Sequence, residues 1–203
     1  MIPAAVVAAP TAVLMLTRLG LLAALHVVPS DYSPVRHAVS DYAVGRTRRL
    51  ATAMTWTAAA AWAGLAATVA IALPTWEHQR STTTWLLVLA VLFAALPHLP
   101  TDLEGARRTR VGTLHLVVAV AWFAISYSLT GTFADLFEGT TLGDALRVLH
   151  LVAAVSLTCL VVALVVPHLR RRAFGLSERV FLVAIAVSYL LVTIGVTTSL
   201  PGR

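Results

Sequence analysis

The chain has 203 residues, of which 59% are hydrophobic and only 12% charged, a balance that excludes a soluble globular domain. Its formal charge of +6 at pH 7 rests on fifteen arginines, because the sequence contains no lysine. These arginines are scattered in short stretches between apolar segments, which argues against nucleic acid as a partner. We therefore expect a polytopic membrane protein whose residues 1–203 form a single transmembrane domain.

A helix needs about 20 apolar residues to cross the hydrocarbon core of a bilayer, and six windows of the sequence qualify, the third being the shortest. They are residues 4–28, 50–73, 84–99, 112–130, 142–166 and 179–200. Four prolines lie at or just past the ends of windows, where proline stops a helix: Pro74, Pro100, Pro167 and Pro201. The predicted fold is an all-α integral membrane protein, a bundle of six transmembrane helices.

The connections after the first, third and fifth windows carry most of the arginines. By the positive-inside rule this side faces the cytoplasm, so both termini should lie on the outer side. The eleven arginines on the predicted inner side are Arg36, Arg46, Arg48, Arg49, Arg107, Arg108, Arg110, Arg170, Arg171, Arg172 and Arg179. The opposite side has Arg80, Arg147 and Arg203.

The first arginine-rich connection contains the densest group of polar side chains, in residues 37–45. The predicted topology places Asp102 and His115 at the same membrane face. One interpretation is a shared site at the cytoplasmic rim of the bundle. The alternative is that these are ordinary solvated loop residues.

Arg18 lies mid-way along the first window, roughly 15 Å from its inner end at 1.5 Å per residue. A central arginine costs about 2.5–3.5 kcal/mol on insertion scales, so we expect a compensating partner. Candidates are Asp41 or Asp102 folded inward, or an anionic group of a ligand such as a phosphate. The alternative is snorkelling, with the first window consisting of two shorter stretches.

His115 begins a stripe with Ala119, Trp122 and Ser126, spaced so that all four lie on one helix face. Such a face could line a cavity, and Asp102 on the same predicted side of the membrane favours that interpretation. A lone histidine in a helix can also be a hydrogen-bonded structural residue, and this alternative stays open.

Three motifs, taken in order, resemble a widespread family of bacterial and archaeal six-helix membrane proteins, the domain of unknown function 998 family. The motifs are His37-x-x-Ser40-Asp41-Tyr42-Ala43-x-Gly45, then Pro100-Thr101-Asp102 with Gly112-x-x-His115, then Gly175-Leu176-x-Glu178-Arg179. Leu99 departs from the aromatic residue that is typical of that position. The resemblance covers about residues 26–196 and implies a six-helix fold and a multi-pass location in the bacterial inner membrane. It implies no reaction.

The residue types favour a membrane-embedded enzyme that acts on a lipid or isoprenoid by carboxylate acid/base chemistry. Protonation of the kind used by terpenoid cyclases and metal-assisted hydrolysis both fit. We assign catalytic roles to Asp41, Asp102 and His115, and substrate contacts to Arg18, His37, Ser40, Tyr42 and Trp122.

A non-catalytic lipid-binding, transport or membrane-assembly component is the alternative. We assign no metal ligands, because no helix carries a paired metal-binding motif. Seven histidines invite haem, but His115 and His150 are expected roughly 13 Å apart in depth, too far to share one haem, while His26 with His115 stays possible. Neither a cofactor nor an oligomeric state follows from the sequence.

Overall fold

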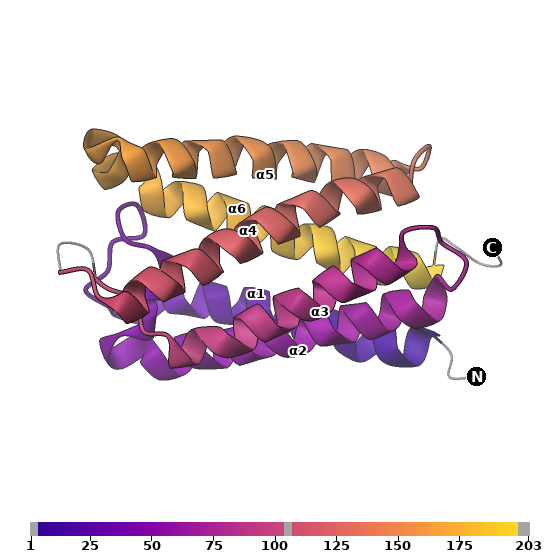
Figure 1. Cartoon of the computed structure of the whole chain (residues 1–203), viewed down its shortest axis with the longest axis horizontal. Coiled ribbons are helices and arrows are strands. Elements are labelled where there is room, and N and C mark those ends of the chain that lie inside the picture. Colours follow the sequence, from indigo (N-terminus) through magenta and orange to yellow (C-terminus); the bar gives the residue numbers. More distant parts are fainter. Residues whose placement is uncertain (1–3, 104–106, 199–203) are drawn as a thin grey trace.

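The structure is a computed structural model that describes residues 4–103 and 107–198. Within those ranges the chain forms no strand, and six long helices pack as a bundle (Figure 1). All six are long and apolar enough to cross a membrane, which confirms the predicted all-α six-helix fold. They are α1 (Ala4–Val27), α2 (Arg48–Ala72), α3 (Gln79–Ala95), α4 (Arg110–Leu136), α5 (Thr141–Val165) and α6 (Pro167–Thr198). Three short 3-10 helices are η1 (Val39–Ala43), η2 (Gly45–Thr47) and η3 (Leu96–His98).

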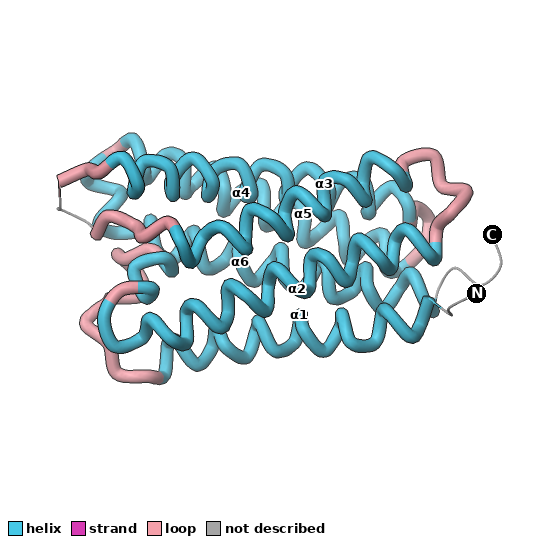
Figure 2. The backbone as a smooth tube through the Cα atoms, turned by 60° about the horizontal axis from the view of Figure 1, so that its bottom comes forward, coloured by secondary structure: helices cyan, strands magenta, loops and turns pink. Residues whose placement is uncertain are grey.

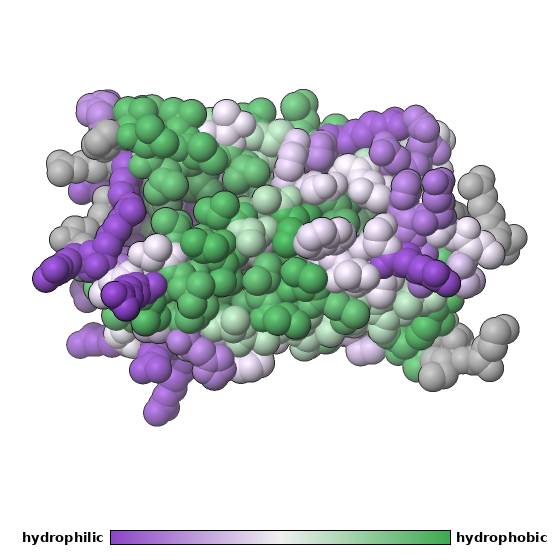
Figure 3. Space-filling model, in the orientation of Figure 1, coloured by the Kyte–Doolittle hydropathy of each residue, from purple (hydrophilic) through white to green (hydrophobic). Residues whose placement is uncertain are grey.

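The α1–α2, α3–α4 and α5–α6 connections meet at one end of the bundle, on the left in Figure 1. We call this the arginine end, because the arginine-rich connections lie there. The helices run along the length of the bundle, and the loops lie at its two ends (Figure 2). Figure 3 shows an apolar band between two polar ends, the surface expected of a protein that sits in a bilayer.

The last helix begins at Pro167, twelve residues before the predicted window at 179. Proline is well tolerated in the first turn of a helix, where its missing N–H has no intrahelical acceptor to lose. Val166 alone separates α5 from α6. Arg170 and Arg172 therefore lie on the first turns of a helix, and the expected third arginine-rich loop is replaced by a helical segment.

The most buried membrane span is α6, with 61% of its apolar window buried against 44% for α2. In α2 the small residues Ala58, Ala61 and Ala66 are almost completely buried, which allows close helix packing. We nevertheless identify α6 as the central helix, because it packs against α5 and α1 and also touches α2 and α4.

Arg179 of α6 joins three parts of the arginine end. Its Nε donates to Nε2 of His26 on α1 over 2.6 Å, and its Nη1 donates to the carbonyl oxygens of His37 and Gly175 over 2.8 and 2.9 Å. Its guanidinium also lies 5.5 Å from the ring centroid of Tyr42. Next to it, Glu178 accepts the backbone N–H of Val39 over 2.7 Å. The connection between α1 and α2 is thereby fixed to α6.

Gly175 allows this connection to lie directly on α6. Its N–H donates to the carbonyl of Val35 over 3.0 Å. A Cβ at position 175 would meet the carbonyl oxygens of His37 and Pro34 at 2.5 and 2.7 Å, distances at which backbone has to move.

Gly175→Ala should therefore destabilise the protein by about 1–3 kcal/mol, the usual scale of an overpacking penalty. Thermal unfolding of the purified protein in detergent measures the change. The matched control is Gly20→Ala in α1, where a Cβ meets no atom within 4 Å and the helix should tolerate it. Equal stability of the two variants would contradict the packing described for the connection.

Candidate functional site

A cavity of about 300 Å³ lies near the arginine end and is lined by residues from all six helices and η1. This volume is at the lower end of the range for small-molecule sites. Its polar lining residues include Arg18, Ser40, Asp41, Asp102, Arg108, His115, Arg170 and Glu178. Its apolar lining residues include Leu22, Met54, Phe93, Leu96, Leu116, Trp122, Phe123, Leu164 and Leu182.

The structure brings most of the residues nominated from the sequence into this one cavity. Those that line it are Arg18, Ser40, Asp41, Asp102, His115 and Trp122. His37 and Tyr42 are not among the lining residues. Nδ1 of His37 accepts the N–H of Ser33, and the buried Tyr42 donates its hydroxyl to the carbonyl of Tyr32. These two side chains shape the connection rather than the cavity.

Arg18 is only 6% exposed, and its Nη1 has no hydrogen-bond partner within the described residues. The guanidinium lies 5.2 Å from the ring centroid of Phe93. The two carboxylates considered as partners, Asp41 and Asp102, form no ion pair with it in the described structure. The snorkelling alternative is also wrong, because α1 is continuous from Ala4 to Val27 and the side chain is buried.

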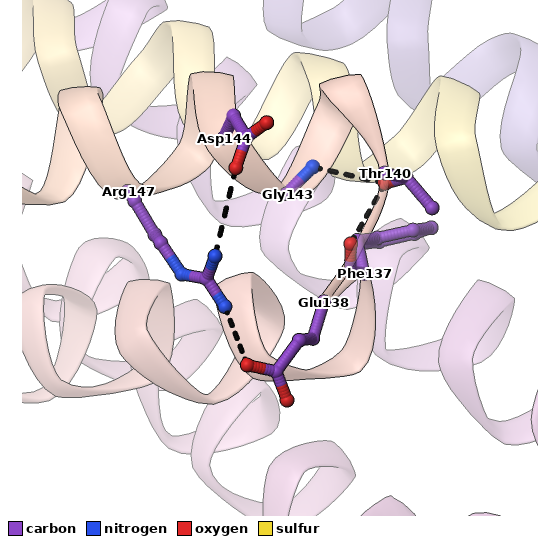
Figure 4. A network of polar contacts seen from close by, with 6 residues as sticks. All are labelled: Phe137, Glu138, Thr140, Gly143, Asp144 and Arg147. Carbon is purple, nitrogen blue, oxygen red and sulfur yellow. Dashed lines mark hydrogen bonds and ion pairs between the residues drawn. The ribbon is translucent and has the colours of Figure 1, made fainter.

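Arg147, at the opposite end of the bundle, differs from Arg18 because it has carboxylate partners. Its guanidinium is half-exposed and reaches Glu138 over 2.9 Å and Asp144 over 3.5 Å (Figure 4). Exposed ion pairs of this kind contribute about 0–1 kcal/mol. Arg18 differs, because no carboxylate of residues 4–103 and 107–198 pairs with it to offset the desolvation of its guanidinium.

The carboxyl group of Asp41 is held by η1. Its Oδ2 accepts the N–H of Ala38 over 3.0 Å, and the residue is 4% exposed. Gly45 ends this motif in the left-handed conformation, with φ of 73°, which favours glycine there. Glu178, which accepts the N–H of Val39 in the same η1, lines the cavity together with Asp41.

Asp102 fixes the start of α4. Its Oδ2 accepts the N–H of Thr109 and its Oδ1 accepts the hydroxyl of Thr109, each over 2.8 Å. The Thr109 Oγ1 in turn accepts the N–H of Gly112 over 3.0 Å as the helix N-cap. A Cβ at Gly112 would overlap the Asp102 carboxylate, so the spacing of the motif has a steric cause.

These hydrogen bonds, first that from the Thr109 backbone and then that from its hydroxyl, lower the pKa of Asp102. The carboxylate therefore stays ionised well below neutral pH and is a poor proton donor. It can serve as an acceptor or as an anchor, which weakens the case for Asp102 as a general acid.

His115 joins α4 to the end of α3. Its Nδ1 lies 2.7 Å from the carbonyl oxygen of Leu99, and since a carbonyl can only accept, Nδ1 carries the proton. In this tautomer Nε2 carries no proton, so its lone pair can accept a hydrogen bond or a proton. Deeper in the cavity, Trp122 packs on Phe93 with ring centroids 5.0 Å apart.

Glu178, Arg170 and Arg179 were not nominated from the sequence as site residues, although the first two line the cavity. The sequence signal that could have indicated Glu178 is the position of its carboxylate directly before the last apolar window. The described residues contain no group of three or more His, Cys, Asp or Glu side chains placed to hold a metal ion.

Thr109→Val keeps the shape of the N-cap residue but removes the hydroxyl that links Asp102 to Gly112. It should cost about 1 kcal/mol of stability, the typical value of an N-cap. Thr113→Val is the control, because that hydroxyl only donates to the carbonyl of Thr109 one turn earlier. Unfolding curves of the two variants in detergent test the difference, and a Thr109 variant as stable as the Thr113 variant would argue against the cap.

The family model described as "Protein of unknown function (DUF998)" matches residues 5–195, nearly the whole chain. No curated protein and no solved structure matches the chain. The match agrees with the resemblance carried by the three sequence motifs, and the chain therefore belongs to the DUF998 family of membrane proteins.

Proposed function

We propose that the cavity binds the anionic head group of a membrane amphiphile, a lipid or isoprenoid phosphate, with Arg18 as its main polar contact. The observation that carries this proposal is the buried guanidinium of Arg18, whose Nη1 lacks a partner within the described residues and which lines the cavity.

The energetics favour an anion as the ligand of Arg18. Taking an arginine out of water costs several kcal/mol unless a charge or hydrogen bonds compensate it. A neighbouring carboxylate would do so, but none pairs with Arg18 in the described structure. The planar guanidinium matches a phosphate or carboxylate through two parallel hydrogen bonds, so a bound anion would supply what the protein lacks.

The lining favours an amphiphile over a free anion. Leu22, Met54, Phe93 and Trp122 surround the depth at which Arg18 lies, about 14 Å from the end of α1 at 1.5 Å per residue. An inorganic anion would leave this apolar surface in contact with water. If the arginine end faces the cytoplasm, as the positive-inside rule predicts, the ligand comes from the inner leaflet of the bacterial cytoplasmic membrane.

Mass spectrometry of an organic extract from the protein, purified in mild detergent, tests the proposal. We expect about one anionic amphiphile per chain in the wild type, since the site holds one guanidinium. Arg18→Met should lose it, whereas the matched variant Arg147→Met at the exposed ion pair should retain it. Equal amounts in all three proteins would argue against Arg18 as the anion site.

The same variants separate a binding role from a structural one. Delipidated Arg18→Met should unfold at the same or a higher temperature than delipidated wild type, because it removes an uncompensated buried charge. Addition of the amphiphile should stabilise only proteins that bind it. A large loss of stability in Arg18→Met without ligand would indicate a structural role instead.

Catalysis on the bound amphiphile is a second candidate, favoured by two buried carboxyl groups, Asp41 and Glu178, that line the same cavity. Either could donate or accept a proton at the ligand. With Asp102 engaged at the start of α4, we assign the acid/base role to this pair and keep His115 as a second proton carrier.

Asp41→Asn and Glu178→Gln each keep a side-chain oxygen that can accept the N–H of Ala38 or of Val39, so both variants should fold. If the pair is catalytic, conversion of the extracted amphiphile should fall by about 100-fold or more, the lower range for general acid/base groups. Chromatography with mass detection measures the conversion, and ligand retention in the same samples serves as the control. Unchanged conversion in both variants would contradict this role.

A further inference from the structure

The cavity is too small for a whole long-chain amphiphile. Its volume of about 300 Å³ is at the lower limit of sites that enclose a small molecule. A ligand whose anionic group lies at Arg18 must therefore place most of its apolar chain elsewhere. This inference rests on the proposed function and concerns where that chain leaves the protein.

The two possible exits differ in polarity. Toward the arginine end the lining includes three charged residues, Asp102, Arg108 and Arg170, which suit water better than an alkyl chain. Between α4 and α5 the lining is apolar. Leu116 of α4 lines the cavity and is 36% exposed, and Leu164 of α5 lines it and is half-buried. Each of these two helices thus contributes an apolar side chain that both lines the cavity and is partly exposed on the outside of the bundle.

The arrangement of the helices agrees with this exit. α4 and α5 meet at the short turn after Leu136 and then separate toward the arginine end, where their ends lie far apart (Figure 1). The cavity lies on that side, with Phe123 of α4 and Leu182 of α6 among its lining residues.

We infer that the cavity opens to the bilayer between Leu116 and Leu164, a lateral portal through which a membrane-resident phosphate amphiphile enters head group first and keeps its chain in the bilayer. Arg18 then selects the head group and the portal selects for ligands that carry a chain. The site draws its ligand from the membrane rather than from the water at the arginine end.

Two probes distinguish the head-group site from the portal: butyl phosphate, whose chain fits within the cavity, and hexadecyl phosphate, whose chain must leave it. Native mass spectrometry of the full chain in a non-ionic detergent measures the fraction bound. Leu164→Trp should reduce hexadecyl phosphate binding by about tenfold, the usual scale of overpacking, and leave butyl phosphate binding unchanged. Leu116→Trp should act in the same way from the opposite side of the portal.

Val161→Trp is the matched control, because Val161 is on α5 one turn from Leu164, 53% exposed and outside the cavity lining. It should bind both phosphates like the wild type. If Leu164→Trp and Leu116→Trp bind hexadecyl phosphate as well as Val161→Trp does, the portal is wrong while the head-group site stands. The portal is also wrong if the two variants lose both phosphates alike. Arg18→Met binding both probes normally would overturn the proposed function itself.

Discussion

The arginine end depends on one side chain, Arg179 of α6. Its nitrogens bind His26 at the end of α1 and the carbonyl of His37 in the following connection, and its plane lies against the ring of Tyr42. Because Arg179 is on the most buried helix, it ties a long polar segment to the centre of the bundle. The position of η1, and hence of Asp41 in the cavity, follows from this attachment together with the contact between Glu178 and the N–H of Val39.

Arg179 and Arg18 show two outcomes for a buried guanidinium. Arg179 has neutral acceptors for two of its three nitrogens and the ring of Tyr42 nearby, so its burial is partly compensated from within the chain. Arg18 has the ring of Phe93 nearby, but its Nη1 has no acceptor among the described residues. Nη2 of Arg179 also has no partner among the described residues, but Arg179 makes three hydrogen bonds to groups of the chain, whereas none is seen for Arg18 within those residues.

Local pattern was enough to predict the six helices, since apolar length and proline positions depend only on neighbouring residues. It also placed Arg18 at depth, and Asp41, Asp102 and His115 at one end. Contacts between distant residues were not predictable in this way. Nothing near Glu178 in the sequence indicates that its partner is Val39, and the start of α6 at Pro167 lies in a polar stretch that hydropathy assigns to a loop. His37 and Tyr42 were nominated by motif alone, and their side chains turn toward the connection.

Asp102 shows that a carboxylate can line the cavity without being a proton donor. Its carboxylate lines the cavity, but both oxygens accept hydrogen bonds from Thr109, and the absence of a Cβ at Gly112 makes room for it. A carboxylate whose pKa is lowered by such bonds stabilises the start of α4 above that pKa, and this contribution is lost only as the pH falls through it. At neutral pH it has no proton to donate. Proton donation to a bound amphiphile would therefore have to come from the buried Asp41 and Glu178, whose distance along the chain hides their shared place in the fold.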